Sequence, residues 1–115
     1  MTIEDLQSIC KPLKGVTQDI KWEDHLCFNV GEKMFLVISP DTVPVSASFK
    51  VSDEEFEELS AKKGFMPAPY LARYKWVHLD NISRLSKKQW EKYISQSYYL
   101  IASKLPSKTK KILGM

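Results

Sequence analysis

The sequence predicts an α+β domain with a single antiparallel sheet and helices packed on one face. Three observations lead to this prediction. Helical patterns with capping signals stand near the start, the middle and the end of the chain. Three short strand patterns run between the first two helices, and a fourth precedes the last helix. Strands joined by short connections pair antiparallel, and amphipathic helices then cover one face of their sheet.

The first helix is expected over residues 3–11. Apolar side chains recur there at helical spacing, and Thr2 with Asp5 forms a capping-box-like pattern at its start. Pro12 and Gly15 follow, and both residue types end helices.

Three strand patterns come next, over residues 25–30, 33–39 and 45–51. The first and third alternate between apolar and polar side chains, whereas the second is apolar on both faces, as is typical of a central strand. Gly31 and Glu32 separate the first two. Glycine at the first position of a two-residue connection predicts a type II′ hairpin.

Two further helices and one strand complete the expected domain, which spans residues 1–115. Capping boxes at Ser52/Glu55 and Ser86/Gln89 open the helices. The expected elements are a helix over 53–63, a helical turn over 70–74, a strand over 76–79 and a helix from about 87 to 105. The tail from about residue 108 is expected to fray.

Composition and charge limit the possible partners. The chain has 115 residues, 43% of them hydrophobic and 27% charged, as in globular proteins, and no apolar run approaches the ~20 residues of a membrane span. The N-terminus lacks the pattern of a signal peptide, and Cys10 and Cys27 form no CxxC pair, so we expect a cytoplasmic protein with reduced thiols. A monomer is favoured.

Charge is distributed unevenly along the chain. Residues 1–63 carry seven lysines and twelve carboxylates, a net charge of −5, whereas residues 64–115 carry ten cations and two carboxylates, a net charge of +8. Such asymmetry favours an anionic partner.

One segment combines cations with aromatic rings. Tyr70, Arg73, Lys75 and Trp76 lie within seven residues, and the same combination can neutralise phosphates and stack on bases. Each aromatic residue can equally be a core residue, and the cations can belong to a solvated face. Lysines elsewhere could extend a phosphate-facing surface: Lys21, Lys87 and Lys88.

Catalytic and metal-binding patterns are missing from the sequence. It has no nucleophile elbow, Walker loop, dinucleotide fingerprint or zinc-protease motif. Ser46 and Ser48 have no evident base, and Asp24 and His25 are expected to point to opposite faces of a strand. We therefore expect no enzyme, no metal and no cofactor.

Several short motifs follow one another along the chain: Lys14-Gly15-Val16-Thr17-x-Asp19, Lys33-Met34-Phe35, Ser48-Phe49-Lys50-Val51, Pro69-Tyr70, Lys75-Trp76-Val77, Ser97-Tyr98-x-Leu100 and Lys104-Leu105-Pro106. In their order and spacing, these motifs resemble the MmcQ/YjbR family of small bacterial proteins. The similarity extends from about residue 3 to 113.

The resemblance implies a CyaY-like fold and a double-wing type of DNA-binding architecture. Together with the cationic segment, it favours a DNA-binding module that contacts phosphates and is weakly selective for sequence. The CyaY-like fold also suggests iron binding. This function is disfavoured because Glu4 and Asp5 are the only acidic residues of the first helix. The alternative function is a small-molecule or protein-partner module with a pocket near Tyr70, Trp76 and His78.

Overall fold

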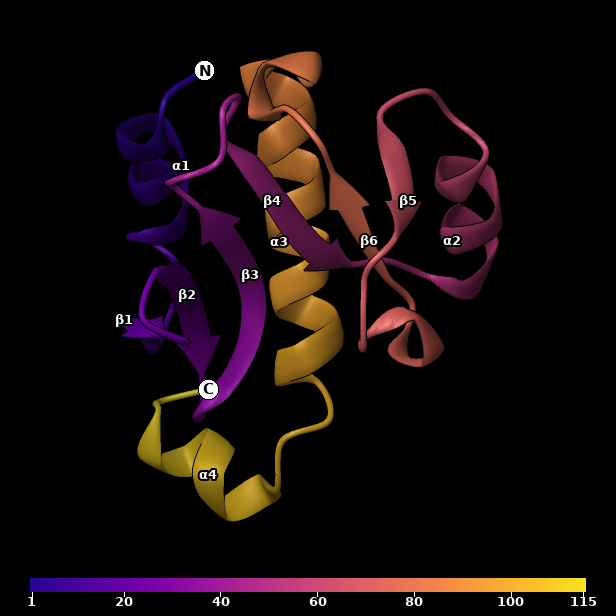
Figure 1. Ribbon diagram of the computed structural model, residues 1–115. Helices are drawn as coiled ribbons and strands as arrows, with labels where there is room; N and C mark the ends of the chain where they lie inside the picture. The colour runs from indigo at the N-terminus through magenta and orange to yellow at the C-terminus, as the bar shows by residue number, and fades with distance from the viewer.

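The computed structural model describes residues 1–115 and contains a six-stranded antiparallel sheet with helices on one face (Figure 1). The predicted fold class is confirmed. The elements in chain order are α1 (Ile3–Cys10), β1 (Val16–Lys21), β2 (His25–Val30), β3 (Lys33–Ser39), β4 (Ser46–Lys50), α2 (Asp53–Ser60), β5 (Phe65–Pro67), the 3-10 turn η1 (Ala72–Tyr74), β6 (Trp76–Leu79), the 3-10 turn η2 (Ile82–Arg84), α3 (Lys87–Ala102) and α4 (Ser107–Ile112).

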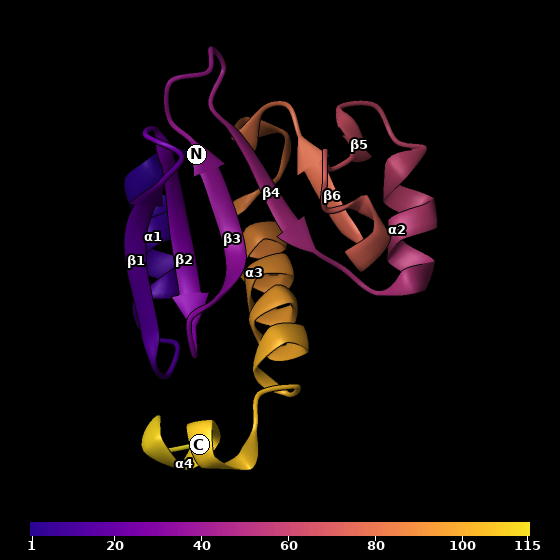
Figure 2. The same cartoon turned by 60° about the horizontal axis from the view of Figure 1, so that its bottom comes forward.

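The strands lie in the order β1-β2-β3-β4-β6-β5. The first four form a meander, and β6 inserts between β4 and β5, so β5 becomes an edge strand (Figure 2). Every neighbouring pair is antiparallel. The two halves of the chain therefore meet within one sheet, at the β4–β6 pairing.

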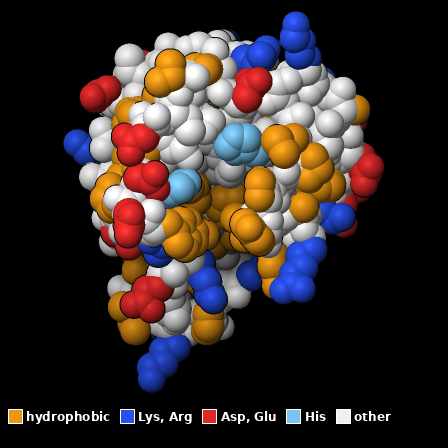
Figure 3. All heavy atoms as spheres, in the orientation of Figure 1, with side chains coloured by type: hydrophobic (Ala, Val, Ile, Leu, Met, Phe, Trp, Pro, Cys, Tyr) orange, Lys and Arg blue, Asp and Glu red, His pale blue; other side chains and the backbone are white.

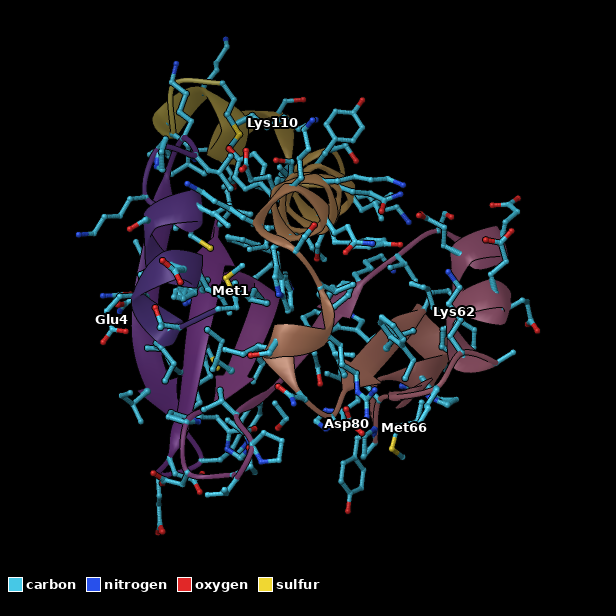
Figure 4. The ribbon with its side chains drawn as sticks, turned by 90° about the horizontal axis from the view of Figure 1, so that it is seen from above. Met1, Glu4, Lys62, Met66, Asp80 and Lys110 are labelled. Carbon is cyan, nitrogen blue, oxygen red and sulfur yellow. The ribbon has the colours of Figure 1, made fainter.

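The main core lies between the sheet and the helices. The long helix α3 packs against β3 and β4, and α1 packs beside it (Figure 4). Phe49 of β4 contacts the ring of Trp90 with a centroid distance of 5.4 Å, and the indole N–H of Trp90 donates to the carbonyl oxygen of Ile82 at 2.8 Å. Both aromatic rings are fully buried. This packing leaves the other face of the sheet without a covering helix.

The capping predictions are largely confirmed. Thr2 with Asp5 and Ser86 with Gln89 form reciprocal capping boxes. Ser52 caps α2 by accepting from the backbone N–H of Glu55, but its hydroxyl also donates to the Glu55 carboxylate, so the reciprocal bond to the cap backbone is missing.

The sequence analysis missed two strands. β1 is an edge strand with mostly exposed side chains, so no apolar alternation revealed it. β5 has three residues and ends in Pro67, a residue that central strands exclude. Both therefore lacked the alternating or continuous apolar patterns that indicated the other strands.

The helix boundaries and the tail also differ from expectation. α2 ends at Ser60 and α3 at Ala102, both about three residues early. The tail expected to fray instead contains α4, and Leu113 behind it packs against the core and near Gly15. None of the helices is both long and apolar enough to cross a membrane.

The hairpin between β2 and β3 has a different turn from the predicted one. Gly31 and Glu32 both have positive φ, 56° and 66°, which defines a type I′ turn rather than type II′. Type I′ matches the right-handed twist of the strands. Leu105 packs so closely on Gly31 that a Cβ atom there would clash with it.

Candidate ligand-binding site

The face of the sheet opposite the helices, called here the open face, carries a row of side chains that crosses all six strands. The registers place the members of this row opposite one another: Asp19, Cys27, Val37, Ser48, His78 and Met66. Side chains alternate between the two faces of a strand, so these six share one face. The row joins residues from both halves of the chain.

The segment after β5 folds over the middle of the open face. The backbone N–H of Ala68 donates to the carbonyl oxygen of Trp76 at 3.0 Å, which ties this segment to the start of β6. Ala68 and Trp76 pack with Cys27 and Val37 in a small apolar cluster that is separate from the main core. This cluster fixes the next residues, 69–71, beside the sheet.

A cavity of about 580 Å³ opens between that segment, the sheet and the β1–β2 turn. Figure 3 looks onto this face and shows a hollow bordered by apolar side chains, with histidines at its edge. No lysine, arginine, aspartate or glutamate lines the cavity. The lining residues are Trp22, His25, Met34, Val37, Ser39, Ser48, Ala68, Pro69, Tyr70, Leu71 and His78.

His78 and Ser48 supply hydrogen-bonding groups to one wall of the cavity. Ser48 Oγ lies 2.9 Å from His78 Nδ1, across the β4–β6 pairing. Burial lowers the pKa of His78 below its usual value, and the nearby carboxylate of Asp80 opposes this shift only in part. The imidazole is therefore neutral at pH 7. The sequence showed no base for Ser48 because this partner comes from a strand thirty residues further along.

His25 and Trp22 form a second part of the lining. The two rings meet edge to face, with centroids 5.7 Å apart. The carboxylate of Asp24 lies 2.7 Å from His25 Nδ1, at ion-pair distance. The sequence analysis expected these two neighbours to point apart, as on a strand. Asp24 instead belongs to the turn before β2, so its side chain can return to His25.

Lys21 lies on the open face outside the cavity, in a polar cluster at the β1 edge. Its ammonium group donates to Asp19 at 3.2 Å and to Asn29 at 3.1 Å, and Asn29 donates to Asp19 at 2.9 Å. The hydrogen bond from Asn29, aided by Lys21, lowers the pKa of Asp19. The charge of Lys21 is thus partly balanced within the protein.

The predicted segment places its aromatic residues in two different environments. Tyr70 is fully exposed, at the mouth of the cavity, whereas Trp76 is 4% exposed and lies in the small apolar cluster. Arg73 is exposed, and its guanidinium lies 4.8 Å from the ring centre of Tyr74 and donates to its hydroxyl. Only Tyr70 of these residues lines the cavity.

The predicted lysines do not converge on one surface. Lys75 is half-buried, with its ammonium group 5.0 Å from the ring centre of Phe56 on α2. Lys87 and Lys88 are exposed in the first turn of α3, on the helical side of the sheet. Lys21 lies near the opposite edge, on the open face. The structure thus places Lys21, Lys75 and the adjacent pair Lys87 and Lys88 in three different parts of the fold.

Sequence reasoning missed most of the cavity. Alternation placed His25 on one face of the β2 pattern and Ser48 on one face of the β4 pattern, whereas the β3 pattern, apolar on both faces, assigned Val37 to neither face. The sequence could not indicate the register that aligns these residues. Nor could it indicate that the segment after β5 folds over them. Trp22 stands outside every strand, so no periodic signal marked it.

Metal ligands do not gather in the structure: no three His, Cys, Asp or Glu side chains are placed to hold one ion. Cys10 and Cys27 are buried and unpaired, as expected, and burial raises the pKa of the Cys10 thiol to about 12.

Comparison with known proteins then identifies the family. The YjbR family model matches residues 12–100. The chain belongs to the YjbR family. The matched region contains every residue that lines the cavity, from Trp22 to His78. The site is therefore part of the YjbR domain itself.

Solved structures support the same assignment. A Deinococcus radiodurans protein with a DUF419 domain superposes with a TM-score of 0.87 and 25% identity, over 99% of this chain and 88% of that one. A Pseudomonas syringae protein has a TM-score of 0.70 and 19% identity, over 87% of this chain and 98% of that one, and shows the shared fold. No curated protein matches the sequence.

Proposed function

We propose that this YjbR protein is a non-enzymatic binding module that holds a small organic molecule in the open-face cavity. The cavity itself carries the proposal. Its volume of about 580 Å³ lies within the range of ~300–1,000 Å³ found for ligand pockets. It also combines an apolar lining with a few polar groups, as such pockets do.

Binding fits the site better than catalysis. Ser48 and His78 are the one pair that resembles a nucleophile and its base. A working pair needs a third group that orients the base, and the nearby carboxylate of Asp80 is instead ion-paired with Arg84 at 2.6 Å. The pair is better suited to recognising a polar group on a ligand.

A screen with two matched variants tests this proposal. Ligand-observed NMR with a collection of common metabolites should yield binders to the wild-type protein. Ser39→Phe places a bulky ring at the cavity wall, at a residue whose side chain makes no hydrogen bond, and should abolish binding. Thr17→Phe makes the same change at an exposed position of β1 outside the cavity and should leave it intact. Ligands that bind the Ser39→Phe variant as tightly as the wild type would contradict the proposal. The absence of any ligand for the wild type would contradict it as well.

DNA binding is the second candidate function. It is favoured by the exposed pair of Tyr70 and Arg73 beside the cavity, and by the net charge of +8 in residues 64–115. It is opposed by the separation of Lys21, Lys87 and Lys88 in the fold.

Fluorescence anisotropy with a labelled duplex of ~20 base pairs distinguishes the two candidates. Phosphate-directed binding weakens with salt, with a slope of log K against log salt of about −0.9 per phosphate neutralised. Arg73→Ala with Lys75→Ala should then weaken binding to all sequences alike and flatten the slope by about one unit per lost contact. Binding unchanged by this double substitution excludes that surface.

We also propose a cytoplasmic location and a monomer. The two unpaired cysteines, Cys10 and Cys27, support the location, because free thiols persist in reducing compartments.

A further inference from the structure

We propose that Trp22 and Tyr70 form an aromatic clamp at the mouth of the cavity, which selects a flat, uncharged heteroaromatic ring. This inference rests on the proposed ligand-binding function and narrows the ligand class. The two residues come from different parts of the fold, the β1–β2 turn and the segment after β5, and both line the same cavity.

The exposure of both rings indicates a role other than stabilising the folded protein. Tyr70 is 100% exposed and Trp22 is 62% exposed. Folding gains nothing from the Tyr70 ring, and most of the Trp22 indole remains in water despite its contact with His25. Large aromatic side chains at the mouth of an apolar cavity provide flat surface on which a ligand ring can stack.

The backbone conformation of these two residues supports the same role. Trp22 has a φ of 51° and Tyr70 a φ of 66°, so both bulky residues adopt the left-handed region. That conformation is costly for residues with a Cβ atom, and such strain concentrates at ligand clamps and active sites. Glycine would fit both positions more easily. The chain instead places aromatic residues there.

The residue types that line the cavity indicate the charge of the ligand. Because no lysine or arginine lines the cavity, a phosphate or carboxylate would lose water without gaining an ion pair to either residue type. Lys21, a basic residue on the open face, is engaged by Asp19 and Asn29. Ser48 and His78 can hydrogen-bond the polar edge of a ring. A neutral heteroaromatic molecule satisfies all of these groups.

Two pairs of probes test ring shape and charge separately. Naphthalenecarboxamide and decahydronaphthalenecarboxamide share one carbon skeleton and one amide, and only the first is flat. Adenosine and adenosine monophosphate differ by a phosphate. We expect the flat amide to bind at least about fivefold more tightly than the saturated one, since stacking on an aromatic ring contributes ~1–3 kcal/mol. The phosphate should give no gain in affinity.

Calorimetry measures the affinities, and tryptophan fluorescence locates the binding. Trp76 and Trp90 are buried, so a ring that stacks at the cavity mouth should quench chiefly the emission of Trp22. Trp22→Ala and Tyr70→Ala should each weaken binding of the flat amide by about tenfold, whereas Trp22→Phe and Tyr70→Phe should stay within about threefold of the wild type. Tyr99→Ala is the matched control, because Tyr99 is 69% exposed on α3, on the other side of the sheet.

The outcomes separate this inference from the proposed function. If both amides bind equally and Ser39→Phe abolishes both, the cavity is a ligand site but the clamp is disproved. If Trp22→Ala and Tyr70→Ala bind like Tyr99→Ala, the clamp is likewise disproved. If adenosine monophosphate binds more tightly than adenosine, the site recognises anions and the proposed ligand class is wrong. If no ligand, probe or metabolite, binds the wild type, the proposed function itself fails.

Discussion

Ser48 Oγ and His78 Nδ1 lie 2.9 Å apart although thirty residues separate them in the chain. Their strands, β4 and β6, are neighbours only because β5 is placed at the sheet edge. The hydrogen bond orients a half-buried imidazole at the cavity wall. The β4–β6 pairing thus holds the one polar pair that both strands contribute to the cavity.

Burial of His78 predicts a loss of stability in mild acid. Its pKa is lowered in the folded protein, so below about pH 6.5 the unfolded chain binds a proton that the folded protein does not. The free energy of unfolding should therefore fall as the pH decreases below about 6.5, and the fall should end once the pH is below the folded-state pKa of His78. The carboxylates with lowered pKa values titrate at lower pH and do not interfere.

Urea titrations at several pH values between 5 and 7 measure this effect. His78→Asn removes the titrating group and should give a flatter dependence than the wild type. A decline in parallel with that of the wild type would show that His78 is not its source.

Replacing Tyr70 by glycine should stabilise the protein while weakening ligand binding. The side chain is fully exposed and its backbone is left-handed, so Tyr70→Gly relieves strain without removing a contact. Relief of about 1 kcal/mol raises the melting temperature of a domain of this size by roughly 3–6 °C. Thermal unfolding followed by circular dichroism measures it, with Tyr99→Gly, in the last turn of α3, as a destabilised control. A lower melting temperature for Tyr70→Gly would show that the ring supports the fold.

The comparison of sequence and structure shows which signals were local. The capping pairs Thr2/Asp5 and Ser86/Gln89 involve residues three apart, and the structure confirms both. The register that aligns Val37 with Ser48 depends on distant packing, and no local pattern contains it. Most of the cavity could not be predicted for the same reason.

Sequence patterns also could not tell which aromatic residues of the segment 70–76 are exposed. Tyr70 and Trp76 look equivalent in the sequence, yet one ring is fully exposed and the other buried. The left-handed conformations of Tyr70 and Lys75 turn the chain twice within this segment and so separate the two rings. Periodicity cannot indicate such turns when no glycine marks them.

Glu32 offers a second test of backbone strain, at the β2–β3 hairpin. It is the second residue of the type I′ turn, with a φ of 66°, and its side chain is exposed. Glu32→Gly should raise the free energy of unfolding by about 0.5–1 kcal/mol, since glycine adopts this conformation at little cost. Equilibrium denaturation gives the value. Gly31→Ala should do the opposite, because its Cβ would lie 2.8 Å from the side chain of Leu105. Equal effects of both substitutions would contradict the turn assignment.

Ser97 joins α3 to two strands of the sheet, and its loss should destabilise the fold strongly. Its side chain is fully buried, donates to the carbonyl oxygen of Phe35 at 2.5 Å and accepts from the backbone N–H of Lys50 at 3.0 Å. Ser97→Ala leaves both backbone groups buried without this partner, and an unsatisfied buried group costs ~1–3 kcal/mol. We expect a total loss of about 2–4 kcal/mol in urea denaturation. Ser95→Ala on the exposed side of the same helix should change stability by less than about 0.5 kcal/mol. A Ser97→Ala protein as stable as the Ser95→Ala control would mean that water or a shift of β3 replaces the hydroxyl.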